Sequence, residues 1–427
     1  MGLLETIINR LSPSKQVESK VIRRVKVQLE RMRQDAETRR LAINEAEQSF
    51  APFRVKMQQM YLNTAENGYI HSCIERRKDL TLLRKWAFVG KDGAVNQQVT
   101  DLFCNTVNGQ TQLKRWFALY IEYTLDALFY GYSLVSLGDI VDGEFPKISN
   151  IPRWFVSPDR LLVSTYPYIM GGTSFVNEDV KDWHVWVDTP NETGVSNCGF
   201  GLFYRVSIYE ILLRNILGFN GDFVELFAQP LRVGKTNKTD EKERAAFEAA
   251  LANMGTAAYI MLDEMGESIE LVSSQLGGTG YQGYADFEKR LEAKVSQLIL
   301  GHADAMSSIP GKLGNDNEDS PMMRAMKDKQ TKDASFVLPY VNKVLFDKLR
   351  ALGFIIPDGV TAVMLNDNEE HEQAERVTDI AVKIKQAGLQ VDGEWFTEQT
   401  KIPVTVMEAV VKTDPNKISN RLKEMYG

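Results

Sequence analysis

Two long helical patterns interrupted by a compact segment constrain the fold of this chain more than any other feature. Apolar residues recur every three or four positions over 207–229 and over 281–302, as on helices with a buried side. The segment between them, 230–280, predicts a strand at 231–233, a helix at 241–254 and a hairpin of 257–262 with 268–272. Because the chain leaves along one helix and returns along the other, we expect an antiparallel pair that carries a small α/β insert on its end.

A polar stretch without periodicity follows the second long helix. Residues 303–320 are rich in Ser, Gly, Asn and Asp, and a loop of this length inside a compact domain is usually either functional or disordered. Pro321 then suits the first turn of another helix, which is predicted to reach about Leu352 with a kink near Pro339. The stretch is therefore expected to be a functional loop held between two long helices.

The rest of the chain mixes helices and strands. A long basic helix is expected over 14–48, because Val17, Val21 and Val25 continue one apolar stripe. The aromatic-rich helix at 112–130 is expected to lie in the core. Further predicted elements are helices at 69–83 and 369–387 and strands at 85–89, 133–137, 154–164, 183–187, 354–356 and 360–365. The predicted class is α+β, mainly helical.

Composition excludes several classes of function. The 427 residues carry a net charge of −7, whereas a protein that clamps DNA through phosphates is usually basic. Three cysteines without a CxxC motif and four scattered histidines give no disulfide framework or zinc site, so no metal and no cofactor are expected. No apolar run approaches the ~18 residues of a membrane span, and no membrane partner is expected. The sequence contains no set of a nucleophile and a base that would predict an enzyme.

One motif does match a known chemistry. Residues from Gly278 to Gly283 fit GxGxxG literally, after a predicted strand and before a helix. A dinucleotide site also needs a second parallel strand after that helix, and the polar stretch stands there instead. The preceding strand, 269–273, is half polar, unlike a central parallel strand. A joint between the insert and the long helix is the favoured interpretation, and a nucleotide-binding enzyme is the less favoured alternative.

Four blocks of sequence, in this order, resemble the Mu-like family of bacteriophage portal proteins. They are 69–78 (YIHSCIERRK), 130–135 (YGYSLV), 227–235 (FAQPLRVGK) and 295–301 (VSQLILG). The resemblance extends from about residue 53 to residue 403 and contains no catalytic motif. It implies a portal-type subunit with wing, stem, clip and crown regions, and no enzyme activity.

The resemblance assigns a region to each part of the chain. It implies a wing at 50–206, a first stem helix at 207–229, a clip at 230–280, a second stem helix at 281–302, a tunnel loop at 303–320, a long wing helix with strands at 321–368, and a helical crown at 369–427. The remaining residues, 1–49, form the basic N-terminal helix predicted above.

The function that the resemblance implies is a ring of twelve subunits at one capsid vertex. Double-stranded DNA would pass through its channel, without sequence preference, during packaging and ejection. The implied partners are other copies of the chain, the terminase large subunit, the head-tail adaptor, and the major capsid and scaffold proteins. The implied location is the virion, and the host cytoplasm during assembly. Another phage scaffold or adaptor protein, membrane-linked through the basic helix, remains an alternative.

Two sets of residues are the candidate sites of such a subunit. The DNA-channel loop would present Ser307, Ser308, Lys312, Asn315, Asp316, Asn317 and Glu318. The clip would contact terminase or adaptor through Arg232, Lys235, Lys238, Lys242 and Arg244. A DNA channel must contact DNA without binding it tightly, because each retained phosphate contact adds salt-dependent affinity. The mixed charges of the loop suit that requirement.

Overall fold

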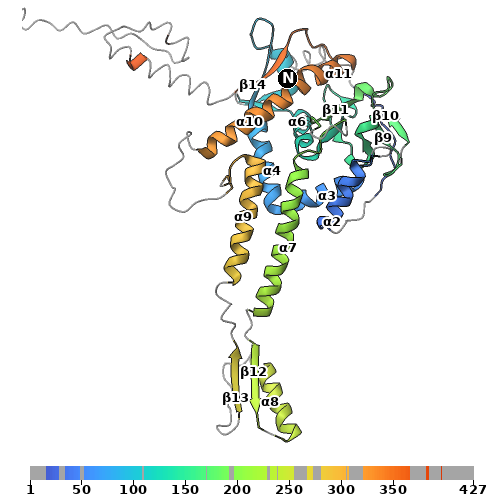
Figure 1. Cartoon of the computed structure of the whole chain (residues 1–427). Coiled ribbons are helices and arrows are strands. Elements are labelled where there is room, and N and C mark those ends of the chain that lie inside the picture. The colour runs from blue at the N-terminus through green and yellow to red at the C-terminus, as the bar shows by residue number, and fades with distance from the viewer. Residues whose placement is uncertain are drawn as a thin grey trace, which may run out of the picture. The chain divides into compact units, whose positions relative to one another are not determined.

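The structure, a computed structural model, has an α+β fold that is mainly helical (Figure 1). It describes residues 16–27, 34–48, 52–107, 110–169, 171–191, 197–227, 231–237, 239–253, 267–272, 280–303, 305–306, 321–365, 381–383 and 396. Contacts divide the chain into a large unit, Met1–Leu83 with Ala87–Val363, and a small one, Arg84–Trp86 with Met364–Gly427. The sites discussed below lie in the large unit.

The N-terminal segment is extended, so the helix predicted over 14–48 is wrong for residues 16–27. Strand β1 (Gln16–Val17) pairs antiparallel with β6 (Ile140–Val141). Ser19 donates two hydrogen bonds to Asp139 Oδ1, of 2.8 Å from its amide and 2.7 Å from its hydroxyl. These bonds lower the pKa of the Asp139 carboxyl. Val21 is 62% exposed, so the apolar stripe is not used, and contacts distant in sequence override a weak helical pattern rich in β-branched residues.

Among the described residues of that predicted helix, those near its end are helical. Helix α2 (Ala36–Ala46) begins at Asp35, whose side chain accepts from the amide of Thr38 while the Thr38 hydroxyl accepts from the amide of Asp35. This reciprocal capping box satisfies two donors that a helix start leaves without partners. Ala42 and Ala46 are buried against the next helices.

The core of the large unit is built on α3 (Val55–Glu66), α4 (Gly68–Leu82) and α6 (Arg115–Tyr130). The aromatic residues of α6 lie in the core as predicted: Trp116 is 3% exposed, and Phe117 and Tyr120 are fully buried. Phe103 of α5 (Gln97–Phe103) packs edge-on against Phe117, with 4.9 Å between the ring centroids, and Phe346 of α11 (Phe346–Ala351) packs at a tilt against Phe103, with 5.7 Å between the centroids. Segments far apart in sequence therefore share one core.

The sheets that the structure describes have two or three strands each. Strand β5 (Tyr132–Ser136) lies between β11 (His184–Asp188) and β7 (Ser149–Asn150). Gly131 turns the chain from α6 into β5 with a φ of 93°, and a Cβ there would lie 2.4 Å from the carbonyl oxygen of Gly199. Two further pairs are β3 (Cys104–Val107) with β4 (Gln110–Leu113), and β2 (Lys85–Val89) with β14 (Thr361–Leu365).

The single strand predicted at 154–164 is broken into pieces. A 3-10 turn opens at Pro158, and Leu161 adopts a left-handed φ of 51°. The chain consequently folds back, so that β8 (Val156–Ser157) pairs antiparallel with β9 (Leu162–Ser164) and β9 with β10 (Gly172–Ser174). Proline at the start of the turn fixes the bend that the apolar pattern did not predict.

Helices α7 (Phe203–Phe227) and α9 (Gly280–Leu300) form the predicted antiparallel pair (Figure 1). The start of α7 packs with the end of α9, because Phe203 and Val206 share a buried cluster with Val295 and Ile299. Between them in sequence lie β12 (Leu231–Thr236), α8 (Glu241–Asn253) and β13 (Glu267–Val272). Strands β12 and β13 pair antiparallel, from Leu231 with Val272 to Thr236 with Glu267. The predicted strand 257–262 lies outside the described residues.

The helix predicted from Pro321 is present and runs through three parts. It begins as α10 (Pro321–Pro339), continues as a π-helix (Tyr340–Leu345) and ends as α11. Pro339 has no amide to donate, and the helix widens directly after it. Tyr120 donates a hydrogen bond of 3.0 Å to the carbonyl of Tyr340 in the widened turn. The helix expected over 369–387 lies outside the described residues except for 381–383, which are helical.

Candidate functional site

The seven predicted loop residues, Ser307 to Glu318, lie outside the described residues. What the structure describes is the frame on either side of them. Helix α9 ends at Leu300, and Gly301 turns the chain with a φ of 91°. The Ser296 hydroxyl donates 2.8 Å to the carbonyl of His302, which fixes the first residues after the helix. On the other side of the predicted loop, the described residues resume at Pro321, the first residue of α10.

One buried arginine joins both sides of this frame. Arg77 of α4 donates two hydrogen bonds to Asp333 of α10, of 2.7 Å from Nε and 2.6 Å from Nη2. Its Nη1 donates 3.0 Å to the carbonyl of Ile299, in the last turn of α9. Arg77 is 7% exposed and Asp333 is 1% exposed. The guanidinium therefore fixes the end of α9 and the middle of α10 relative to α4.

Other contacts support this clamp. The guanidinium lies 5.5 Å from the ring centroid of Phe129, at the end of α6. Gln330, one turn before Asp333, donates to the carbonyl of Leu80 in α4. Burial lowers the pKa of the nearby Lys329 ammonium, and the charge of Arg77 lowers it further. A buried bidentate pair with satisfied hydrogen bonds gives a stiff connection, because any sliding of α10 would strand two charges away from water.

Sequence reasoning missed this pair, although a signal for it exists. Met326 and Val337 lie on the buried side of α10, and Asp333 shares that side at helical spacing from both. A carboxylate within an apolar stripe indicates a buried partner of opposite charge. The partner, Arg77, lies 256 positions away in the sequence, so its identity could not be deduced from spacing.

The structure describes the side chains of three of the five predicted clip residues, and two of these three lie on different sides of one helix. Lys242 and Arg244 are exposed on α8 and stand two positions apart, which places them about 160° apart around the helix. Lys235 is exposed on β12. The side chain of Arg232 and the whole of Lys238 lie outside what is described. Glu241 and Glu243 make the first turn of α8 acidic, so the segment presents mixed charge.

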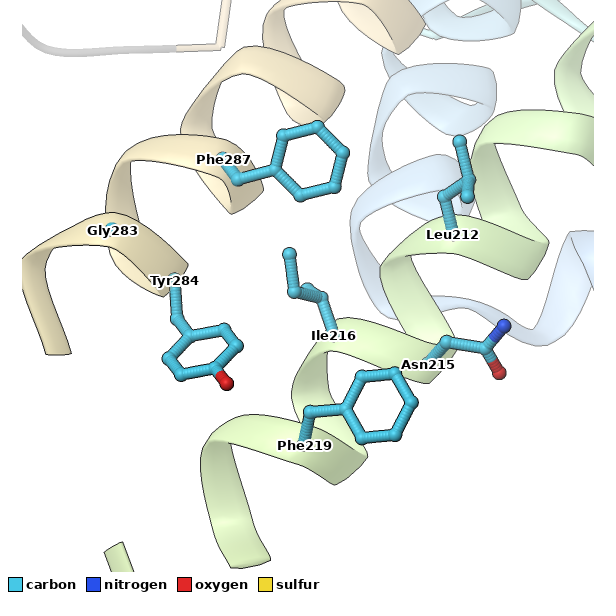
Figure 2. A pocket seen from close by; sticks show the side chains of 7 residues that line it. All are labelled: Leu212, Asn215, Ile216, Phe219, Gly283, Tyr284 and Phe287. Atoms are coloured by element: carbon cyan, nitrogen blue, oxygen red, sulfur yellow. The ribbon is translucent and has the colours of Figure 1, made fainter. Parts of the chain in front are cut away.

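A groove between α7 and α9 was not predicted from the sequence. It has a volume of about 610 Å³ and opens beside the ends of the two helices that lead to the insert (Figure 2). Its lining is apolar except for one amide and one hydroxyl, and consists of Leu212, Asn215, Ile216, Phe219, Gly283, Tyr284 and Phe287. The sequence signal for this groove is a set of aromatic residues near the insert, at one end of each of two helices. The opposite ends of both helices are already buried in the core.

The GxGxxG segment does not adopt the geometry of a dinucleotide site. Gly280 and Gly283 lie inside α9, and the strand before the segment, β13, pairs antiparallel with β12. The fingerprint requires a parallel βαβ unit. In the parts of the chain that the structure describes, no three His, Cys, Asp or Glu side chains are grouped as metal ligands. No described helix has both the length and the hydropathy needed to cross a membrane.

Solved structures with the same fold are found in gene transfer agent particles. A chain from the virion of a native gene transfer agent particle matches with a TM-score of 0.55 and 13% identity, over 87% of this chain and 100% of that chain. A chain from the neck of a native particle, computed with C12 symmetry, gives 0.52 and 12%, with the same coverage. Identities this low show a shared fold. Among curated proteins no match is found.

A family model gives the more specific result. The model described as the portal protein of Mu bacteriophage matches residues 58–402. This range agrees with the extent of the resemblance seen in the sequence, about 53–403. It contains the helix pair, the insert, the clamp of Arg77 and Asp333, and the stretch between α9 and α10. The chain therefore belongs to the family of the portal protein of Mu bacteriophage.

Proposed function

We propose that this protein is a portal subunit that forms a ring of twelve copies at one capsid vertex, and that double-stranded DNA passes through the ring during packaging and ejection. The observation that carries the proposal is the frame around 303–320, in which Arg77 holds the end of α9 and Asp333 of α10 at once. A segment with rigidly held ends can present the same polar groups from every subunit. The C12 symmetry of the matched neck supports the number twelve.

The regions of the subunit follow from this proposal. Residues 50–206 and 321–368 form the wing, α7 and α9 the stem, the segment with β12, α8 and β13 the clip, and 369–427 the crown. The clip docks the terminase large subunit during packaging and the head-tail adaptor afterwards, through Lys235, Lys242 and Arg244 on its exposed surface. The wing contacts the major capsid and scaffold proteins. The subunit resides in the virion, after assembly in the host cytoplasm.

The DNA contact is weak and independent of sequence. Ser307, Ser308, Lys312, Asn315, Asp316, Asn317 and Glu318 would offer one cation beside two carboxylates. With a net charge of −7 per subunit, the ring gains little from counterion release, so DNA is confined without being held. The protein carries out no reaction of its own in this role. The energy for DNA movement comes from the partner that docks on the clip.

The ring is tested on the purified full-length protein. Mass photometry and negative-stain images are expected to show closed rings of about twelve subunits. Coexpression with the capsid protein provides a second condition, in case ring closure needs a template. Monomers or dimers alone under both conditions would contradict the proposal. Rings that bind linear and circular DNA with nucleotide-sequence preference would contradict the passive channel but not the ring.

A further inference from the structure

We propose that the groove between α7 and α9 receives Leu217 of a neighbouring copy of this chain, so that each subunit offers a socket on one side of α7 and a knob on the other. The inference rests on the ring proposed above and names the contact that closes it. It goes beyond the family match, because the residues follow from the exposure and spacing of this helix pair.

The socket is mostly apolar, and several of its side chains are exposed in the part of the chain that the structure describes. Phe219 is 60% exposed, Phe287 is 43% exposed and Leu212 is 37% exposed, although all three line the groove. Figure 2 shows the rings of Phe219, Tyr284 and Phe287 around the open space, with Ile216 at its centre. Among the residues that the structure describes, no charged side chain lines it. Burying such surface is favourable, and only an apolar occupant gives the gain without stranding a polar group.

The knob lies on the far side of the same helix. Leu217 is 51% exposed, and it stands about 160° around the helix from Asn215 and Phe219, which line the groove. Gly218 and Gly221 flank it, and a Cβ added at either would meet nothing within 4 Å. Glycine is the least favourable helix residue after proline. In the part of the chain that the structure describes, no contact explains these two glycines, but they would let a helix of another copy approach closely.

A second copy is the occupant that satisfies both faces at once. In a heterologous ring, each subunit uses two different surfaces, one toward each neighbour. With α7 parallel to the ring axis, rotation about that axis leaves the height of each residue unchanged, so the knob and the socket must lie at the same height along the helix. Leu217 lies one residue from Ile216 and two from Phe219, a difference in height of only about 1.5–3 Å. A soluble partner of another kind would not require this match.

The contact is tested by paired cysteines in the full-length chain. Leu217→Cys with Phe287→Cys places one thiol on the knob and one in the socket. Under mild oxidation, the pair is expected to give a ladder of covalent oligomers up to the closed ring on non-reducing gels. The native Cys73, Cys104 and Cys198 are buried, so the background is low. Each single variant is a control, and Leu217→Cys with Val176→Cys is a matched pair, because Val176 is 53% exposed on another element.

A second variant separates assembly from folding. Gly218→Leu fills the open space beside the knob and is expected to keep or raise the melting temperature of the subunit, because leucine favours the helix. The same change is expected to reduce the ring fraction several-fold, whereas Gly68→Ala, at another glycine without close neighbours, leaves it unchanged.

The outcomes distinguish this inference from the proposed function. If rings form normally but the cysteine pair gives no ladder of oligomers, the proposed contact of Leu217 with the groove is wrong, and the proposed ring still stands. A fast-migrating monomer with an intrachain bond would also overturn this contact, since Leu217 would then face α9. A Gly218→Leu variant that assembles like the wild type would do the same. Wild-type protein that never associates would remove both the ring and its contact.

Discussion

At the scale of single residues, the pair of Arg77 and Asp333 is the most consequential contact of the described chain. The pair matters more for the arrangement of the helices than for net stability, because the cost of removing two charges from water offsets much of their attraction. The bidentate bonds to one carboxylate, the bond to the carbonyl of Ile299 and the ring of Phe129 leave the guanidinium one orientation. Three helices are consequently held in one register.

Removing one member of this pair is expected to be far more damaging than replacing both. Arg77→Met leaves Asp333 buried without a partner, and we expect a loss of about 3–5 kcal/mol in the free energy of unfolding. Arg77→Met with Asp333→Leu should recover a large part of that loss. Urea unfolding followed by circular dichroism measures both. Arg76→Met, at the exposed neighbouring position of α4, serves as control, and equal losses in the single and double variants would contradict the expectation.

At the scale of elements, the sequence predicted what local periodicity controls. The helix pair α7 and α9, the core position of α6, and the helix from Pro321 are confirmed because each is long and strongly periodic. The segment 16–27 was mispredicted because its conformation depends on Asp139 and β6, more than a hundred residues away. The pairing of β12 with β13 was likewise set by a partner that lies beyond any local window.

The π-helix offers a prediction at this scale. Asn342 extends its amide to β14, where Nδ2 donates 3.1 Å to the carbonyl of Ala362 and Oδ1 accepts 2.6 Å from its amide. The side chain thus takes the place of a neighbouring strand. Asn342→Leu leaves both main-chain groups of a buried residue unsatisfied, and we expect a loss of about 1–3 kcal/mol.

Hydrogen exchange provides the specific readout for this variant. The amide of Ala362 should exchange faster in Asn342→Leu, while amides of α6 keep their protection until global unfolding. Lys343→Ala, one residue along and exposed, is the matched control and should change neither measurement. Unchanged exchange at Ala362 would show that another group replaces the lost partner.

At the scale of the whole molecule, the sequence predicted where the candidate site lies but not which contacts hold it. The position of the stretch between two long helices followed from its lack of periodicity. The clamp that holds its ends did not, because Arg77 and Asp333 read in isolation as ordinary charged residues of helices. The socket between α7 and α9 was not predictable for a related reason, since it is lined by residues of two helices that are far apart in the sequence.

A deletion tests the role of that stretch in the assembled particle. Removal of residues 311–319 is expected to leave subunit stability and ring formation unchanged, because the contacts of Arg77 and Ser296 lie outside the deleted segment. Particles built with this variant should package or retain less DNA, as measured by nuclease-protected DNA per capsid. Replacing the same residues by a Gly-Ser segment of equal length separates composition from length. Normal packaging and retention would disprove the role of the stretch and leave the family membership untouched.

The separation of Arg77 from Asp333 also sets an order of events during synthesis. The two residues lie 256 positions apart, and ribosomes add about 5–20 residues per second, so Arg77 emerges roughly ten to fifty seconds before its partner. Through that interval α4 carries a guanidinium whose burial nothing yet compensates. The first half of the large unit therefore lacks this contact until Asp333 has emerged, and its closure around α4 is expected to follow the synthesis of α10.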